Sequence, residues 1–202
     1  RPPVTITLFL TIILNYIYIH LFYILNKLSM SNLNDLTVII VTYKTKEEIL
    51  FNCINSIKKE VKIINVENSN DVSHKNKIEE KYDNVKVILS GKNLGYGSAN
   101  NLGLKNTQTR YVLISNPDVE YNQNFFDEIN FYLKNDVEFS IIGPTYNDET
   151  TYLSYGSLDG GIIDKKYNKF FLKEVGYVVG CSMLLDTKNI KTKILLKIFG
   201  RF

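Results

Sequence analysis

The chain has 202 residues, of which 45% are hydrophobic, and a net charge of +3. This length allows one domain with a packed core, and the small, scattered charge argues against a nucleic-acid-binding surface. Cys53 and Cys181 lack the spacing of a zinc site or a disulfide framework, so the sequence favours a reducing compartment.

The first 29 residues differ in composition from the rest. Residues 4–25 hold only aliphatic, aromatic and uncharged polar side chains and one histidine. A helix of this length would span the roughly 30 Å hydrocarbon core of a bilayer. The chain begins with Arg1, however, and Met30 opens the polar segment "MSNLND" directly before the first predicted strand. We therefore interpret residues 1–29 as upstream read-through, with a membrane anchor and a processed leader as alternatives.

Residues 36–144 alternate between apolar, β-branched runs and amphipathic stretches. The apolar runs predict strands at residues 36–42, 61–66, 85–90, 111–116 and 138–144. Helical spacing predicts helices after a Thr45–Glu48 capping box, at residues 75–82, from about Ser98 and at residues 122–134. This alternation predicts an α/β fold with right-handed crossovers and a mostly parallel sheet flanked by helices.

The pattern changes after Pro144. Residues 145–175 are rich in Tyr, Asp, Gly and Thr, which predicts an irregular loop or a hairpin. Strand character returns at residues 176–186, and residues 187–202 form a basic and apolar tail that is atypical of the rest. We expect one domain over residues 30–186.

The predicted strands end in polar or glycine-bearing segments: Thr42-Tyr43, residues 67–69, residues 91–101 and residues 116–118. Ligands of open parallel sheets bind beyond the carboxyl ends of the strands. These four segments therefore predict a ligand site at one edge of the sheet.

Asp118 is the candidate metal ligand. Pro117 stops the strand and holds Asn116 extended, so the carboxylate of Asp118 stands just beyond a buried strand. Mg²⁺ and Mn²⁺ prefer oxygen ligands and can neutralise a departing diphosphate. The alternative is an ordinary β-turn, for which Asn-Pro-Asp is common.

The segment "GKNLGYGSANNLG", residues 91–103, is the candidate phosphate-binding loop. Its glycines allow backbone to approach a ligand, and a helix beginning near Ser98 would aim free N–H groups at phosphate. A dinucleotide fingerprint is excluded because Asn100 stands where the third glycine belongs. The alternative is a glycine-rich turn without a ligand.

The segment "VENSND", residues 66–71, places Glu67 and Asn68 where they could bind a base or ribose, with a solvated loop as the alternative. His74 has no partner at a recognisable spacing, so we expect it on the surface. Cys181 beside Gly180 indicates tight packing, since no histidine is placed to activate the thiol.

The order "VIIVTYK", "VENSND", "NLGYGSANNLG", "ISNPDVE", "VVGCSMLL" resembles the inverting glycosyltransferases of family 2, in particular the rhamnosyltransferase-like branch. The resemblance covers residues 36–186, with a poor match at residues 145–172. It implies a GT-A fold, which is Rossmann-like, a nucleotide-diphosphate sugar as donor, and Mg²⁺ or Mn²⁺ as cofactor.

The resemblance also implies roles for single residues. Asn116 and Asp118 match the metal motif, with Asp118 as the ligand, and Gly180 and Cys181 match the strand that borders the acceptor. Glu67 stands where the family usually has Asp. The residues implied in nucleotide-sugar binding are Thr42, Tyr43, Glu67, Asn68, Asn93, Gly95, Tyr96, Gly97, Asn100 and Asn116.

One part of the family pattern is missing. Inverting transfer needs an acidic base that takes the proton of the acceptor hydroxyl, and no acid follows Asp186. The catalytic base is therefore unknown, with Asp159, Asp164 and Glu174 as substitutes, and we interpret the domain as truncated.

The sequence thus predicts a glycosyltransferase that acts on a polysaccharide or lipid-linked glycan, in the cytoplasm at the inner face of the membrane. The alternatives are a catalytically dead nucleotide-binding fragment and a nucleotidyltransferase, although "TYKTKEE" lacks the glycine expected of the latter.

Overall fold

The structure is a computed structural model that describes residues 32–122, 124–135, 137–143, 155–156, 163–167, 170–174, 177–178 and 180–190. For residues 155–156, 163–167, 170–174 and 177, the description is limited to the backbone. The predictions for residues 1–29 and for most of the tail at 187–202 lie outside the described residues. Within the described part, no helix is long and apolar enough to cross a bilayer.

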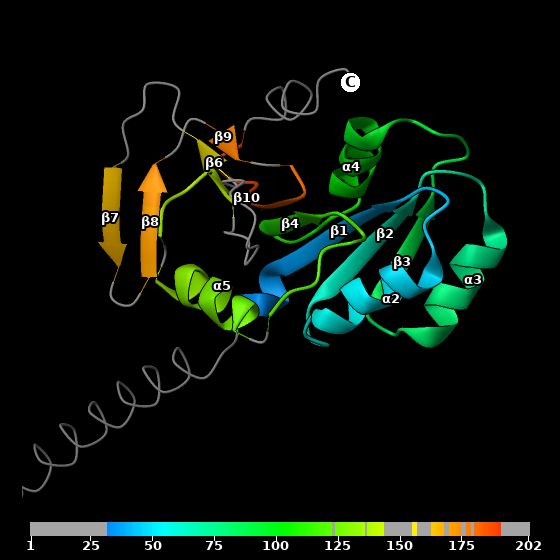
Figure 1. The fold of residues 1–202 in the computed structure, drawn as a ribbon, viewed down its shortest axis with the longest axis horizontal. Coiled ribbons are helices and arrows are strands. Elements are labelled where there is room, and N and C mark those ends of the chain that lie inside the picture. Colours follow the sequence, from blue (N-terminus) through cyan, green and yellow to red (C-terminus); the bar gives the residue numbers. More distant parts are fainter. Residues whose placement is uncertain are drawn as a thin grey trace, which may run out of the picture. The chain divides into compact units, whose positions relative to one another are not determined.

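Strands and helices alternate along the chain, as predicted (Figure 1). The elements are η1 (Asn32–Asp35), β1 (Leu36–Thr42), α2 (Glu47–Ser56), β2 (Lys62–Glu67), α3 (Val72–Lys81), β3 (Val85–Leu89), α4 (Tyr96–Lys105), β4 (Tyr111–Ser115), α5 (Phe125–Lys134), β5 (Ile141–Ile142), β6 (Tyr155–Gly156), β7 (Ile163–Tyr167), β8 (Phe170–Glu174), β9 (Tyr177–Val178) and β10 (Ser182–Asp186).

Six of these strands form one sheet in the order β3-β2-β1-β4-β10-β5. β1 pairs in parallel with β2 and β4, and β2 pairs in parallel with β3. β10 runs antiparallel to both β4 and β5. The predicted mostly parallel sheet is confirmed, and the carboxyl ends of β1, β2, β3 and β4 lie at one edge of it. Separate antiparallel pairs join β6 to β9 and β7 to β8.

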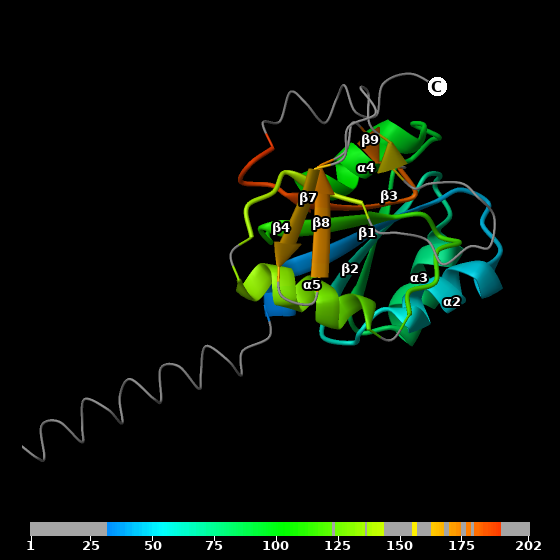
Figure 2. The same cartoon turned by 60° about the vertical axis from the view of Figure 1, so that its left-hand side comes forward.

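Each face of the sheet has its own hydrophobic core. On one face, Leu36, Val38 and Ile40 of β1 pack with buried residues of α2, α3 and α5. On the other face, Ile39 and Val41 pack with residues of α4. Figures 1 and 2 show α2 and α3 on one side of β1 and β2 and α4 on the opposite side. Because both faces of β1 are covered, all seven of its residues are buried, as its continuous apolar sequence predicts.

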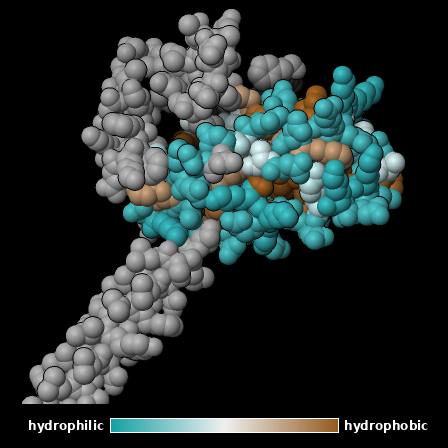
Figure 3. All heavy atoms as spheres, turned by 60° about the horizontal axis from the view of Figure 1, so that its bottom comes forward, coloured by the Kyte–Doolittle hydropathy of each residue, from teal (hydrophilic) through white to brown (hydrophobic). Residues whose placement is uncertain are grey.

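The described surface over α2, α3 and α5 is mainly hydrophilic, with fewer hydrophobic residues visible between the polar ones (Figure 3). This is the ordinary surface of helices that bury one stripe against a sheet.

Several boundaries differ from the sequence prediction. The Thr45–Glu48 capping box is wrong, because α2 has Lys46 at its N-cap, without a side-chain cap, and the Thr45 hydroxyl accepts from the Tyr43 N–H at 3.3 Å instead. α3 begins at Val72, before the predicted residue 75, because the Asp71 side chain caps it. The strand predicted over residues 138–144 is reduced to Ile141–Ile142.

Candidate functional site

β1 and β2 end side by side at the edge where the sequence predicts a ligand. Thr42 and Glu67 are partners in the parallel register, and the Thr42 hydroxyl donates to Glu67 Oε2 at 2.7 Å. The Ser69 hydroxyl donates to Glu67 Oε1 at 2.6 Å. Both carboxylate oxygens are therefore already hydrogen-bonded, and Glu67 is only 4% exposed. Its carboxylate lies beneath the edge, on the face of the sheet that α3 covers.

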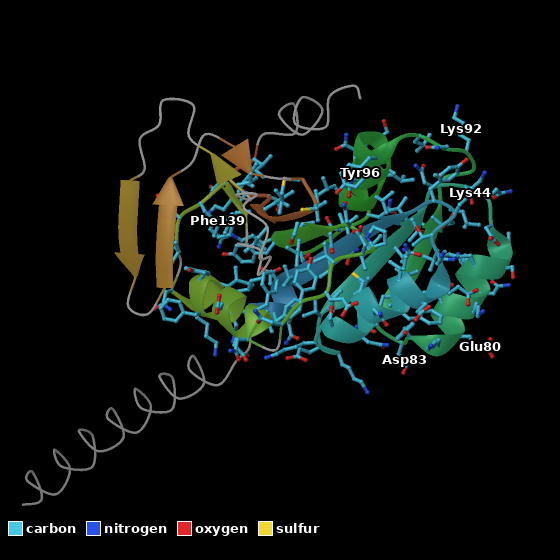
Figure 4. All side chains as sticks on the ribbon, viewed as in Figure 1. Lys44, Glu80, Asp83, Lys92, Tyr96 and Phe139 are labelled. Atoms are coloured by element: carbon cyan, nitrogen blue, oxygen red, sulfur yellow. The ribbon has the colours of Figure 1, made fainter. Side chains whose placement is uncertain are left out.

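The turn after β1 presents an aromatic ring at this edge. Tyr43 is 44% exposed, and the Lys44 ammonium lies over its ring, 5.4 Å from the centroid. Lys44 has φ 54°, a left-handed conformation that is uncommon for a residue with a Cβ. In Figure 4, Lys44 and Lys92 lie near the carboxyl ends of β1 and β2. An exposed ring beside a cation offers a flat surface on which a base can stack.

The segments after β2 and β3 are tied together by two asparagines. Asn68 Nδ2 donates to Asn93 Oδ1 at 2.9 Å, and Asn68 Oδ1 accepts from the Leu94 N–H at 2.9 Å. The Ser90 hydroxyl also donates to Asn68 Oδ1, at 3.3 Å. Asn68 is 3% exposed, whereas Asn93 is exposed. Asn68 therefore holds the loop in place, and Asn93 lies on its surface.

Helix α4 begins at the same edge. Its N-cap is Gly95, with φ 78° and ψ 162°, a conformation that glycine adopts without the strain of a side chain. The Gly95 N–H donates to Asn93 Oδ1 at 2.9 Å. The helix starts two residues earlier than predicted, so Tyr96 and Gly97 lie in its first turn, where backbone N–H groups lack partners within the helix.

Tyr96 and Asn100 occupy the inner side of α4. Asn100 is fully buried; its Nδ2 donates to the Tyr96 carbonyl at 3.0 Å, and its Oδ1 has no hydrogen-bond partner among the described residues. The Tyr96 hydroxyl donates to the Gly180 carbonyl at 2.7 Å. Burial raises the pKa of Tyr96 to about 12, so the hydroxyl stays protonated at neutral pH.

The tip of β4 carries the Asn-Pro-Asp segment. Asn116 is half-buried; its N–H donates to the Cys181 carbonyl at 2.8 Å, and its carbonyl accepts from the Ser115 hydroxyl at 2.9 Å. Asp118, two residues on, is exposed at the edge. Beneath it, burial raises the pKa of the Cys53 thiol to about 12, which excludes Cys53 as a nucleophile at neutral pH.

The two residues predicted at the acceptor side are thus hydrogen-bonded to residues predicted to bind the donor. The Gly180 carbonyl accepts a hydrogen bond from the Tyr96 hydroxyl, and the Cys181 carbonyl accepts one from the Asn116 N–H. The predicted tight packing at Gly180 is wrong within the described part, because a Cβ there would meet no described atom within 4 Å.

His74 is the residue that the sequence reasoning placed wrongly. Its side chain is only 10% exposed, and its Nε2 lies 3.0 Å from Asn65 Oδ1 and 3.7 Å from Glu67 Oε2. The sequence did hold a signal: Asn65 interrupts the apolar run "VKIINV", and a buried amide must find partners. Asn65 also donates to the Ile40 carbonyl at 3.1 Å and to the Thr42 hydroxyl at 3.0 Å.

A depression of about 320 Å³ lies at the opposite end of the sheet. It is lined by the first residues of β2 and β3, by the turn before β3 and by the segment after α4, including Lys62, Asn84 and Thr107. None of the predicted site residues lines it, so we do not connect it with the ligand site.

The fit of a metal ion depends on Asp118. Among the described residues, no three histidine, cysteine or acidic side chains gather to hold a cation. Mg²⁺ is often bound by one or two carboxylates together with substrate phosphates. The exposed Asp118 fits an ion of that kind, which takes its other ligands from a diphosphate.

The side chains of the three candidate bases, Asp159, Asp164 and Glu174, are not among those that the structure describes. Asp159 lies outside the described residues. Asp164 and Glu174 lie in β7 and β8, where the backbone register pairs Asp164 with Lys173 and Ile163 with Glu174. Their side chains lie outside the description.

Comparison with known proteins assigns the chain to a family. The sequence model of Glycosyl transferase family 2 matches residues 37–192, from β1 to beyond β10. The chain belongs to glycosyltransferase family 2. This confirms, at the level of the family, the resemblance drawn from the five sequence segments, and it assigns the chain to a glycosyltransferase family rather than to the nucleotidyltransferases.

A curated relative and two solved structures are similar to this family 2 chain. The relative, the low-salt glycan biosynthesis hexosyltransferase Agl10 of Haloferax volcanii, is 31% identical over 122 residues, or 58% of this chain and 38% of the relative. S. aureus TarS 1–349 matches with a TM-score of 0.54 and 17% identity over 75% of this chain and 47% of that chain. The mannosyltransferase PcManGT from Pyrobaculum calidifontis, in complex with GDP-Man and Mn²⁺, matches with a TM-score of 0.53 and 15% identity over 83% and 47%. These two structures confirm the GT-A type fold. The family 2 chain spans about half of the length of each solved structure and 38% of the length of the curated relative.

Proposed function

We propose that this family 2 chain binds a nucleotide-diphosphate sugar at the carboxyl edge of its sheet and serves in transfer of the sugar to a polysaccharide or lipid-linked glycan, with inversion. The observation that carries the proposal is the meeting of accessible groups from three chain segments, residues 42–43, 91–101 and 116–118, at this edge. They supply the exposed Tyr43, the loop of Asn93, the first turn of α4 and the exposed Asp118.

The predicted binding residues divide into two groups by burial. The exposed or half-buried ones are proposed to contact the donor: Tyr43, Asn93, Gly95, Tyr96, Gly97 and Asn116. The buried ones, Thr42, Glu67, Asn68 and Asn100, are proposed to hold these in place from below. The separation follows from water access, since a ligand contacts only surfaces that water can reach before it binds.

Asp118 is proposed to bind Mg²⁺ or Mn²⁺ on the donor diphosphate. The ion would neutralise charge on the departing diphosphate. The similarity to a mannosyltransferase solved with GDP-Man and Mn²⁺ supports this choice. The N–H groups of the first turn of α4 would add favourable backbone contacts to phosphate.

On the acceptor side, we propose that the Gly180-Cys181 turn borders the acceptor, because it is bonded to both Tyr96 and Asn116. The base that takes the acceptor proton is proposed to be an acid other than Asp118, since a carboxylate bound to a cation is a poor proton acceptor. The free cysteines Cys53 and Cys181 agree with a cytoplasmic site of action.

A thermal-shift titration of the full chain tests the donor site. UDP, dTDP and GDP would each be added with Mn²⁺ and with a chelator. A ligand at about 100 times its Kd adds roughly 2.7 kcal/mol of stability. We expect stabilisation by one nucleotide that requires Mn²⁺ and is lost in Asp118→Asn.

Asp83→Asn is the matched control. Asp83 is also an exposed aspartate in a turn, but it lies before β3, at the opposite end of the sheet (Figure 4). It should leave the nucleotide response unchanged. Absence of any nucleotide response in a folded sample, or an equal response in Asp118→Asn, would contradict the proposed function.

A further inference from the structure

We propose that His74 is a positioning residue of the donor site, which holds Glu67 and Asn65 so that the segment from Asn68 to Asp71 keeps one conformation against the nucleoside of the donor. This inference rests on the proposed function. It assigns a role in donor recognition to a histidine that the sequence placed on the surface.

The first argument is a closed ring of contacts. His74 Nε2 lies 3.7 Å from Glu67 Oε2, and Glu67 Oε1 accepts from the Ser69 hydroxyl at 2.6 Å. The same hydroxyl oxygen accepts from the Asp71 N–H at 3.2 Å. Asp71 Oδ1 then accepts from the His74 N–H at 2.9 Å, at the N-cap of α3. The ring returns to its starting residue, so the backbone between Glu67 and His74 is fixed at both ends and in the middle.

The second argument is the direction of the hydrogen bonds around Asn65. The Ile40 carbonyl can only accept, so the Asn65 amide must turn its Nδ2 toward it, as the 3.1 Å bond shows. Asn65 Oδ1 therefore faces His74, and the His74 Nε2 at 3.0 Å must carry a proton to donate. Asn65 is fully buried, so this oxygen would lose its partner if the imidazole were removed.

The third argument is that Glu67 has little capacity left for a base. Thr42 and Ser69 already donate to its two oxygens, and α3 covers it from the side. These bonds hold the Glu67 side chain under the sheet edge, where it is 5% exposed. The surface at the end of β2 is therefore made by the segment that follows, in which Asn70 and Asp71 are exposed.

The fourth argument places this segment on the nucleoside side. In the sheet order, β1 lies between β2 and β4, so the tip of β2 is two strand spacings, about 10 Å, from the tip of β4 that carries Asp118. A donor whose diphosphate lies at Asp118 can extend its nucleoside across β1 toward β2. Tyr43, exposed at the end of β1, lies on that path.

The test compares His74→Leu and His74→Gln in the full chain. Affinities are measured by calorimetry for the nucleoside diphosphate that binds the wild-type chain best and for pyrophosphate, both with Mn²⁺. Leucine removes the donor to Asn65, whereas glutamine keeps an N–H at the end of a flexible side chain. We expect His74→Leu to weaken the nucleoside diphosphate about tenfold, which corresponds to one lost hydrogen bond. Pyrophosphate should bind as in the wild type, and His74→Gln should recover most of the nucleotide affinity.

Asn84→Leu is the matched control for lost stability. Asn84 Nδ2 donates to the Val61 carbonyl at 2.9 Å in a partly buried bond at the opposite end of β2 and β3. This variant loses a comparable bond far from the donor edge, so its nucleotide affinity should be unchanged. If His74→Leu does not fold, Ser69→Ala breaks the same ring at its centre and is expected to weaken the nucleotide selectively.

The outcomes separate the two proposals. Unchanged nucleotide affinity in His74→Leu, or in Ser69→Ala where that variant replaces it, overturns the role of His74 and leaves the donor site intact. Equal weakening of nucleotide and pyrophosphate also overturns it, because the effect is then not confined to the nucleoside. A wild-type chain that binds pyrophosphate and no nucleoside diphosphate overturns both proposals.

Discussion

Replacing Arg110 by Met is expected to destabilise the sheet strongly, because Arg110 neutralises a carboxylate that water cannot reach. Asp186, the last residue of β10, has a side chain that is 0% exposed. Arg110, just before β4, donates to it through Nε at 3.1 and 3.2 Å and through Nη2 at 2.7 Å. The Lys188 N–H at 3.0 Å and Asn189 Nδ2 at 3.2 Å supply the other donors. The pair therefore joins the end of β10 to the beginning of β4.

The magnitude follows from these contacts. Breaking a fully buried ion pair costs about 3–5 kcal/mol. The Arg110 side chain is 35% exposed, and two donors to Asp186 remain in the variant, so the loss falls at or below the lower end of this range. We expect Arg110→Met to lower the free energy of unfolding by about 2–3 kcal/mol. Arg110→Lys should lose less, since lysine keeps the charge without the two-pronged geometry.

Urea unfolding followed by circular dichroism measures this change, with an unchanged m-value as the condition for comparison. The double variant with Asp186→Asn tests whether the loss belongs to the pair, because the coupled residues should then lose less together than the sum of the single losses. A loss below about 0.5 kcal/mol in Arg110→Met, the range of ordinary surface substitutions, would refute the reasoning.

Two further predictions concern packing and burial. A Cβ at Gly103 would lie 2.7 Å from Ile39 Cγ2 and 3.3 Å from Val66 Cγ2. Gly103→Ala should therefore destabilise the chain by about 1 kcal/mol in urea unfolding, because overpacking outweighs the gain in helix propensity. The exposed Lys105→Ala in the same helix is its control, and a stabilised Gly103→Ala would show that α4 is not held this close. Cys53 should react with a thiol reagent at pH 8 much more slowly than the half-buried Cys181, because burial raises the pKa of Cys53 from 9.0 to about 12. The same shift means that the contribution of Cys53 to stability is complete below pH 9 and is lost as the pH rises toward 12, so Cys53→Ala should flatten that part of the stability profile.

The sequence alone determined the elements and their order. The apolar run of β1 predicts burial on both faces, and all seven residues are buried. Alternating strands and helices predict the mostly parallel sheet. The polar segments that follow the strands predict one common edge, and the bond between Thr42 and Glu67 and the bond between Asn68 and Asn93 place three of these segments together. These features are readable because they depend on periodicity and on chain direction.

Local signals were less reliable at the ends of elements. Thr45 and Glu48 have the spacing of a capping box, but the Thr45 hydroxyl bonds within the turn after β1 instead. Asp71 caps α3 without an acidic partner three residues on, so the helix begins earlier than its apolar pattern. A hydroxyl or carboxylate near a helix start has several N–H groups within reach, and the path of the chain selects among them.

Only the tertiary structure decided which site residues face a ligand and which support it. Glu67 and Asn68 belong to the same polar segment as the exposed Asn70 and Asp71, yet both are buried, because hydrogen bonds from Thr42, Ser69 and Ser90 draw them inward. His74 has no partner nearby along the chain and gains Asn65 only when α3 packs on β2. The direction of a side chain depends on neighbours that are distant in sequence, and a single sequence does not contain those distances.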